Sequence, residues 1–275
     1  MTTIVYMAVE TGTLLIGMVL AAAAVGITGI VCGLGLGVAN EKFKVEVDEK
    51  EIAIREVLPG NNCGGCGFPG CDGCAKAMAS GEAGPNQCPV GGATVAAKVA
   101  EILGVEAGEQ EKWIAFVKCT GTCNHTSSRF KYVGPQDCRQ ASVIPGGTDK
   151  SCTYGCMGYG SCVRACEFDA IHVIDGVAIV DKDKCTACKK CIAACPKNLI
   201  ELVPYKAKHL VRCSSQEKGK DVISKCTIGC IACTMCVKSC PKQAIAMNGN
   251  VALIDYQICE NCGICAEKCP RKTIA

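Results

Sequence analysis

Aromatic side chains are scarce in this sequence: they make up 4% of its 275 residues and include a single tryptophan, Trp113. Large rings normally fill much of a large hydrophobic core, so the sequence does not indicate a conventional core of the size its length would allow. Inorganic clusters can take that place, because each one ties four positions of the chain to one centre. A strong net charge and a basic tail are also absent, since the formal charge is only +3. This argues against nucleic-acid binding.

Cysteine, in contrast, is abundant, with 27 residues in the chain. In a short secreted protein such a content would indicate a disulfide scaffold. Here the cysteines fall into tight runs with two or three residues between them, which is the spacing of iron–sulfur ligands. Neighbours this close cannot pair with each other without strain, and thiolate ligation needs a reducing compartment. We therefore expect the cysteine-rich part to lie in the cytoplasm.

The N-terminal segment is predicted to be a single transmembrane helix within residues 1–40. Residues 11–40 carry no charge, and the apolar part from Leu14 to Val38 exceeds the ~20 helical residues that cross a membrane. The alternative is a cleaved signal peptide, but no Lys or Arg precedes the stretch and it is too long for a signal core. Lys42 and Lys44 follow the span. They favour a single-pass protein of the cell membrane with its iron–sulfur domains on the cytoplasmic side.

Small residues recur along one face of this helix. Gly29, Gly33 and Gly37 are four residues apart, and Ala22 and Gly26 extend the same stripe. In lipid such a stripe lets another helix approach closely, which predicts packing against other membrane subunits. The alternative is that glycine is simply frequent in membrane helices.

The first cysteine motif lies in a predicted domain of residues 61–112, after a charged linker of residues 41–60. It reads N-N-C-G-G-C-G-F-P-G-C-D-G-C, and its spacing is C-x2-C-x4-C-x16-C through Cys63, Cys66, Cys71 and Cys88. Four cysteines also suit zinc. The dense glycines favour a [4Fe–4S] cluster, because they let the backbone curl and point its amides at the sulfurs. Cys74, about one helical turn past Cys71, is left over.

An internal duplication is the most specific signal in the sequence. Eight cysteines recur 74 positions later. The first copy consists of Cys152, Cys156, Cys162, Cys166, Cys185, Cys188, Cys191 and Cys195, and the second of Cys226, Cys230, Cys236, Cys240, Cys259, Cys262, Cys265 and Cys269. Between the runs, alternating apolar residues surround the hairpin signals Asp175-Gly176 and Asn248-Gly249. The fold class is therefore predicted as α+β, with two tandem bacterial two-cluster ferredoxin modules at residues 151–205 and 206–275.

Each module follows the pattern C-x2-C-x2-C-x3-C-P, in which three cysteines hold one cluster and the fourth holds the other. In the second module this crossing rule groups Cys230, Cys233, Cys236 and Cys269 at one cluster, and Cys240, Cys259, Cys262 and Cys265 at the other. In the first module it groups Cys166, Cys185, Cys188 and Cys191. The remaining site has a gap, because Tyr159 stands where the repeat has Cys233.

We predict that Cys152 fills this gap beside Cys156, Cys162 and Cys195; a three-iron cluster that lacks one ligand is the alternative. The sequence thus predicts at least five [4Fe–4S] clusters. A sixth remains open, with candidate ligands in a connector of residues 113–150 and ahead of the second module: Cys119, Cys123, Cys138, Cys213 and Cys226. Cys119, Cys123, His125 and Cys138 are alternatively a zinc site, and unligated structural thiols are the third possibility.

All-cysteine ligation leaves no open iron, so we expect electron transfer and no catalytic residue on this chain. No Walker A loop is present, and Gly33 to Gly37 lies inside the membrane span, where it cannot form a dinucleotide loop. From Lys182 to Lys225 the chain has eleven Lys or Arg against four Asp or Glu. Such a stretch attracts an acidic partner by charge; an ordinary solvated face is the alternative.

A membrane helix, then the glycine-rich four-cysteine motif, then tandem ferredoxin modules resembles the B subunit of the Rnf complex in its extended clostridial or acetogen-like form. N-C-G-G-C-G-F-P-G-C and S-C-T-Y-G-C-M-G-Y-G-S-C carry the resemblance. It implies a membrane complex that oxidises soluble reduced ferredoxin, reduces NAD⁺ and translocates Na⁺ or H⁺. In such a complex this chain would pass electrons through its clusters to the membrane subunits. A membrane-anchored polyferredoxin of a hydrogenase or another reductase, without ion pumping, is the alternative.

Overall fold

The computed structural model describes residues 2–42, 48–108 and 111–275. It divides into two compact units, Met1–Asp48 and Glu49–Ala275. Among the described residues, the first unit contains one long helix, and the second combines short helices with three two-stranded antiparallel sheets. The α+β class is thereby confirmed.

Helix α1 (Thr2–Lys42) contains the predicted membrane span. Among the described residues, its stretch Ile16–Lys42 is the one segment long and apolar enough to cross a membrane. Its leucine, isoleucine and valine side chains are exposed, which suits a surface that faces lipid or other helices. Residues 43–47 of the predicted linker lie outside the described residues.

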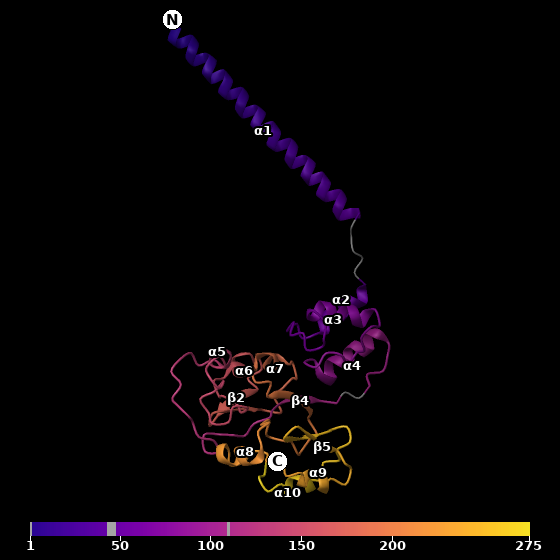
Figure 1. The fold of residues 1–275 in the computed structure, drawn as a ribbon. Helices are drawn as coiled ribbons and strands as arrows, with labels where there is room; N and C mark the ends of the chain where they lie inside the picture. Colours follow the sequence, from indigo (N-terminus) through magenta and orange to yellow (C-terminus); the bar gives the residue numbers. More distant parts are fainter. Residues whose placement is uncertain (1, 43–47, 109–110) are drawn as a thin grey trace. The chain divides into compact units, whose positions relative to one another are not determined.

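Helices α2 (Glu49–Val57), α3 (Gly70–Ala79) and α4 (Gly92–Leu103) form the core of the first cysteine-rich domain (Figure 1). α2 packs against both α3 and α4. Ile54, Met78 and Val99, one from each helix, are completely buried. The end of α4 is set by Gly104, whose φ of +70° allows the left-handed turn that closes a helix. This small apolar core holds α3, and with it Cys71 and Cys74, in a fixed position.

Strand β1 (Trp113–Val117) pairs antiparallel with β4 (Ile200–Pro204). β1 belongs to the segment predicted as a connector, where no pattern of residues indicates such a pairing. Ile114 and Val203 are buried in a core shared with the first ferredoxin module. The connector therefore begins as a part of that module and not as a spacer before it.

Two hairpins repeat at corresponding places, as the duplication predicts. The first joins β2 (Ile171–Ile174) to β3 (Val177–Val180) through Asp175 and Gly176, both with positive φ, which is the backbone of a type I′ turn. The second joins β5 (Ile245–Asn248) to β6 (Val251–Ile254). Its turn is Gly249-Asn250, one residue later than predicted, because Asn248 still pairs with Val251.

Short helices complete the two modules. α6 (Ser161–Arg164) packs against α7 (Lys190–Ala194), and α9 (Met235–Ser239) packs in the same way against α10 (Ile264–Glu267). α5 (Cys138–Ala141) lies in the connector, and α8 (Gly219–Lys225) lies in the lead-in of the second module, before its first run of cysteines. Cysteines lie within or beside most of these helices, and the short helices position their side chains.

Candidate metal centres

The cysteine runs share one backbone geometry. In each C-x2-C-x2-C run the residues on either side of the middle cysteine have positive φ: Ala187 and Lys189 around Cys188, Ala232 and Thr234 around Cys233, and Asn261 and Gly263 around Cys262. For residues other than glycine this conformation costs about 1–3 kcal/mol and is found mostly at functional sites. Alternating left-handed residues turn successive amides toward one point, which makes a cradle for a negatively charged group.

The degenerate run of the first module keeps this cradle. Gly158 and Gly160, which flank Tyr159, have φ of +82° and +71°. The backbone at Tyr159 therefore follows the path that surrounds Cys233 in the repeat, although the thiol itself is missing. The loop thus has the backbone geometry of a cluster site, but it contributes only two thiols, those of Cys156 and Cys162.

In the second module the cysteines group as the crossing rule expects. One cavity is lined by Cys230, Cys233, Cys236 and Cys269, which we call site 5. A second cavity is lined by Cys240, Cys259, Cys262 and Cys265, which we call site 6. The amide of Thr273 donates a hydrogen bond of 3.3 Å to Sγ of Cys269. Amide donors of this kind favour the thiolate and tune a bound cluster.

The first module contains one group of the same type, Cys166, Cys185, Cys188 and Cys191, which we call site 2. Burial raises the pKa of Cys191 to about 12, and the thiols of Cys185, Cys188 and Cys166 raise it further. The amide of Ala115, on β1, donates to Sγ of Cys185 at 3.3 Å. The unexpected strand thus supplies a hydrogen bond to the site.

The other group in this module differs from the expectation. The cavity beside Cys156, Cys162 and Cys195 is lined by Cys138, and not by Cys152. Burial raises the pKa of Cys162 to about 12, with Cys156, Cys138 and Cys195 among its close thiols. We call these four cysteines site 3. Cys138 lies far from the module's runs in sequence and has no counterpart in the repeat, so the spacing could not reveal it.

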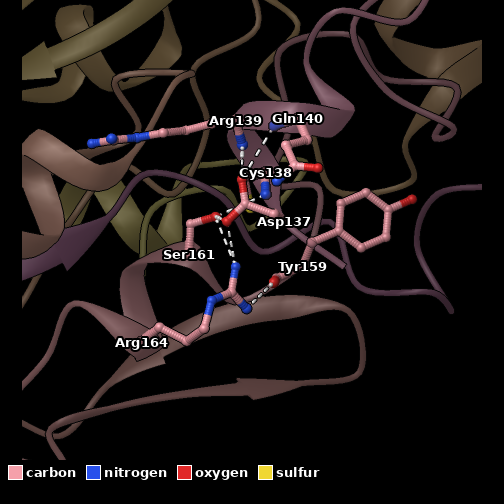
Figure 2. Close-up of polar contacts among 7 residues, drawn as sticks. All are labelled: Asp137, Cys138, Arg139, Gln140, Tyr159, Ser161 and Arg164. Atoms are coloured by element: carbon pink, nitrogen blue, oxygen red, sulfur yellow. Dashed lines mark hydrogen bonds and ion pairs between the residues drawn. The ribbon is translucent and has the colours of Figure 1, made fainter. Parts of the chain in front are cut away.

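A polar network holds Cys138 against the degenerate run (Figure 2). The amide of Cys138 donates to Oγ of Ser161 at 2.8 Å, and this hydroxyl donates to Oδ2 of Asp137 at 2.9 Å. Arg164 forms an ion pair with the same carboxylate and donates to the carbonyl of Tyr159 at 3.1 Å. Asp137 also caps α5, since Oδ1 accepts the amides of Arg139 and Gln140. These bonds lower the pKa of Asp137 to about 2 and connect α5 to α6.

The ring of Tyr159 packs beside Cys138, the fourth cysteine of site 3. Its centroid lies 5.1 Å from that of Tyr132, and both rings contact the small apolar cluster of Cys138, Ala141 and Met157. Tyrosine at this position therefore fills the space around α5. Tyr159 and Cys138 therefore belong to the same locally packed cluster.

Cys152 lies instead in a cavity with three cysteines from other segments. Cys119, Cys152, Cys213 and Cys226 line it together, and we call this group site 4. A Cβ placed on Gly155 would lie 3.5 Å from Sγ of Cys119 and 3.6 Å from Sγ of Cys152. Burial raises the pKa of Cys213 to about 11, although amides of Cys230 and Ser215 oppose the rise.

Pairing between distant segments assembles site 4. Thr126 forms an isolated antiparallel bridge with Cys226, and Oγ1 of Thr126 donates to the carbonyl of Lys225 at 2.9 Å. The amide of Thr227 donates to the carbonyl of His125. The connector is thus attached to the segment ahead of the second module, which brings Cys119 to Cys226.

The remaining candidates for the sixth site do not join it. Cys123 is exposed, and His125 contacts Oγ1 of Thr227 at 2.7 Å through Nδ1. In the described part of the chain, no three His, Cys, Asp or Glu side chains lie close enough to share one metal ion. The arrangement therefore does not support a zinc site of Cys119, Cys123, His125 and Cys138.

In the first domain Cys66, Cys71 and Cys88 lie around the buried Cys74. Burial raises the pKa of Cys74 to about 12, and the nearby thiols of Cys66, Cys88 and Cys71 raise it further. Cys63 is half-buried and lies near Cys188 of site 2. We call Cys63, Cys66, Cys71 and Cys88 site 1 after the motif; in the structure, Cys74 is the thiol that lies beside the last three. A Cβ on Gly65 would lie 3.3 Å from the backbone of Cys188, so this glycine permits close approach between sites 1 and 2.

Three family descriptions match the cysteine-rich part. "Putative Fe-S cluster" matches residues 58–90, "4Fe-4S binding domain" residues 178–201, and "4Fe-4S dicluster domain" residues 229–273. The chain therefore binds iron–sulfur clusters of the four-iron type, and the cysteine donors, apolar cavities and inward amides described above fit them.

Several similar proteins match most of the chain, and three of them are B subunits of ion-translocating oxidoreductase complexes. That of the Na⁺-translocating ferredoxin:NAD⁺ oxidoreductase complex of Acetobacterium woodii is 48% identical over 85% of this chain and 70% of its own length. That of the ion-translocating oxidoreductase complex of Methanosarcina acetivorans is 40% identical over 84% of this chain and 88% of its own. That of the proton-translocating ferredoxin:NAD⁺ oxidoreductase complex of Clostridium ljungdahlii is 40% identical over 85% and 82%.

Proposed function

Since the chain belongs to the family of B subunits of ion-translocating ferredoxin:NAD⁺ oxidoreductase (Rnf) complexes, we propose that it carries electrons through six [4Fe–4S] clusters in series, from soluble reduced ferredoxin to the membrane subunits. Electron transfer within such a complex, and attachment to the membrane, follow from the family. The number of clusters, their ligands, the order of the sites and the ferredoxin partner are the proposal.

The ligands are the six groups of four cysteines. They comprise Cys63, Cys66, Cys71 and Cys88 (site 1); Cys166, Cys185, Cys188 and Cys191 (site 2); Cys138, Cys156, Cys162 and Cys195 (site 3); Cys119, Cys152, Cys213 and Cys226 (site 4); Cys230, Cys233, Cys236 and Cys269 (site 5); and Cys240, Cys259, Cys262 and Cys265 (site 6). Only Cys32, Cys74 and Cys123 of the 27 cysteines remain. A bound cluster takes up and releases single electrons, while the protein holds its thiolates, donates amides to them and excludes water.

Contacts between neighbouring groups support a continuous series. Cys63 of site 1 lies near Cys188 of site 2, and Cys191 of site 2 near Cys162 of site 3. Between sites 3 and 4, the amide of Cys156 donates to Sγ of Cys119.

The series continues into the second module. Cys213 of site 4 accepts the amide of Cys230 of site 5. Sites 5 and 6 share one apolar core, in which Cys236 and Cys265 are both buried. Every site therefore has a neighbour through which an electron can pass, and this is the observation that carries the proposal.

We infer that electrons enter at the C-terminal module and leave at site 1. Site 1 lies in the domain that follows the membrane helix directly in sequence, which suits an exit toward membrane subunits. The basic stretch 182–225 presents exposed lysines, Lys206 and Lys208 among them, to an acidic ferredoxin. The cysteine domains face the cytoplasm in this proposal, because thiolate ligands need a reducing compartment.

The membrane helix is proposed to pack against another subunit through Gly29, Gly33 and Gly37. A Cβ on any of the three would meet no other described residue within 4 Å, which leaves the stripe open to a partner helix. Coupling to ion movement and NAD⁺ reduction belongs to other subunits of the complex.

A rapid-mixing experiment tests the series. Reduced ferredoxin is mixed with the purified complex, and the order of cluster reduction is followed by freeze-quench electron paramagnetic resonance. With the double variant C119S/C213S, which lacks site 4, we expect reduction to stop at sites 5 and 6. Full reduction of the first module at the wild-type rate would contradict the series. The variant C123S, which changes a cysteine outside all six sites, is the matched control.

A further inference from the structure

We propose that Lys150 is an electrostatic tuning residue, whose buried ammonium raises the reduction potentials of the clusters at sites 3 and 4 above those they would otherwise have. This role rests on the proposed occupancy of the two sites. It goes beyond that occupancy, because it belongs to a residue that is not a ligand.

Lys150 is unusual in its burial. The residue is 6% exposed, and among the buried residues of the described chain it is the only lysine, arginine, aspartate or glutamate. Nζ donates to the carbonyl of Gly176 at 2.6 Å and to the carbonyl of Gly121 at 3.2 Å. No ion pair of the described residues includes it. Burying a cation without a carboxylate is costly, so another negative group nearby is expected.

The two neighbouring sites supply that negative charge. Lys150 lines the cavity of site 4 together with Cys119, Cys152 and Cys226. Sγ of Cys119 in that cavity also accepts the amide of Cys156, a cysteine of site 3, at 3.3 Å. The ammonium therefore lies beside the point where the two sites meet. Gly121 links it to the sulfur directly, since its carbonyl binds Lys150 and its amide donates to Sγ of Cys119 at 3.4 Å.

The effect of this charge on reduction follows from electrostatics. A cluster with four thiolates is an anion, and it becomes more negative when it accepts an electron. A fixed cation in a weakly polarisable interior stabilises the reduced form more than the oxidised form, so the potential rises. Lys190 near site 2 and Lys242 near site 6 are instead paired, with Glu167 and Glu260, and those pairs are partly exposed. Their net effect on a cluster is correspondingly smaller.

Sites 3 and 4 are the middle of the proposed series. With higher potentials, these two clusters hold an electron more stably than their neighbours do, so the electron resides there between its transfer from ferredoxin and its transfer to the membrane subunits. Lys150 thus affects the sequence of reduction potentials along the series of clusters, in addition to the stability of its own loop.

The test compares three variants of the full chain in the purified complex. K150Q keeps a hydrogen-bond donor but removes the charge, K150R keeps the charge, and K131Q removes an exposed lysine of the same connector as a control. Anaerobic redox titrations followed by electron paramagnetic resonance give the midpoint potential of each component. The components of sites 3 and 4 are recognised by their loss in C138S and C119S.

We expect K150Q to change the oxidised-to-reduced ratio of both components at fixed potential by at least tenfold, a shift of about 59 mV to lower potential for a one-electron couple. K150R and K131Q should titrate like the wild type. Unchanged potentials in K150Q would overturn the inference. So would loss of iron from K150Q, because Lys150 would then serve assembly of the sites. A wild-type chain that lacks the site 4 component would instead overturn the proposed function.

Discussion

The backbone amide of Cys156 donates a hydrogen bond of 3.3 Å to Sγ of Cys119. Cys156 comes from the first ferredoxin module, whereas Cys119 comes from the connector that precedes it. The bond therefore joins site 3 to site 4, and it connects the altered site of the first ferredoxin module to one built from segments that no ferredoxin pattern describes. Because different segments of the chain supply the cysteines of the two sites, substitutions at each site are expected to have separable effects.

Cys138 and Cys152 are expected to serve different sites. In C138S the cluster of site 3 should be lost, because serine is a poor ligand for this cluster and the degenerate run offers no other thiol. In C152S the cluster of site 4 should be lost while site 3 remains. Each variant should lose about four irons per chain, with different spectral components missing. Loss of the same component in both variants would contradict the assignment.

Tyr159 offers a rescue experiment. Because Gly158 and Gly160 keep the backbone of a cluster loop, a cysteine at this position should reach site 3 as Cys233 reaches site 5. The double variant C138S/Y159C should therefore regain the irons that C138S loses. Iron content and the recovered spectral component are the readouts. Failure of Y159C to rescue, with the protein otherwise folded, would show that the loop no longer faces the site.

The network around Asp137 should matter for site 3 alone. D137A removes the cap of α5 and the ion pair with Arg164, which together hold Cys138 in place. Loss of such a cap typically costs about 1 kcal/mol. We expect site 3 to lose its cluster several times faster in the presence of an iron chelator, while the other sites release iron at wild-type rates. D169A, which changes an exposed acid of the first ferredoxin module that pairs with Lys184, is the control.

The glycine stripe of α1 is tested by adding bulk to it. G33L should leave the chain in the membrane but reduce its co-purification with the other subunits, because the leucine prevents close helix packing. G35L adds the same side chain between the positions of the stripe and serves as the control. Equal recovery of the complex with both variants would indicate that the glycines do not mediate helix packing and only reflect the frequency of glycine in membrane helices.

Charge reversal tests the basic stretch as a ferredoxin surface. K206E/K208E should slow the reduction of the chain by ferredoxin, chiefly through the association rate, and the difference from wild type should shrink as salt rises. Stopped-flow reduction at several ionic strengths measures both effects. K131E reverses an exposed charge outside the stretch. A K131E effect as large as that of K206E/K208E would indicate a general response to net charge.

The spacing of the cysteines predicted much of the site, because ligands that are local in sequence must lie together. The crossing rule anticipated the groups now called sites 2, 5 and 6, and it identified Tyr159 as the weak point. It could not find Cys138, whose position depends on hydrogen bonds among Asp137, Ser161 and Arg164. Nor could it assign Cys152, because Cys119, Cys213 and Cys226 approach it only after distant segments pair.

The fold shows the same division between local and long-range information. The hairpin at Asp175-Gly176 follows from two residues that favour a type I′ turn. The pairing of β1 with β4 joins residues more than eighty positions apart. The short strand Trp113–Val117 has no alternation of apolar and polar residues from which a strand could be predicted. Its role depends on a long-range contact as well, since the amide of Ala115 donates to the sulfur of Cys185.

The central claim is that six groups of four cysteines each hold one cluster, and anaerobic counting of iron and sulfide on the purified chain tests it most directly. We predict about 24 irons and as many sulfides per chain, since each cluster contains four of each. The count should fall to about 20 in C119S and in C213S, where one cluster is lost, and stay unchanged in C123S. A wild-type count near 20 that neither C119S nor C213S lowers would contradict the claim.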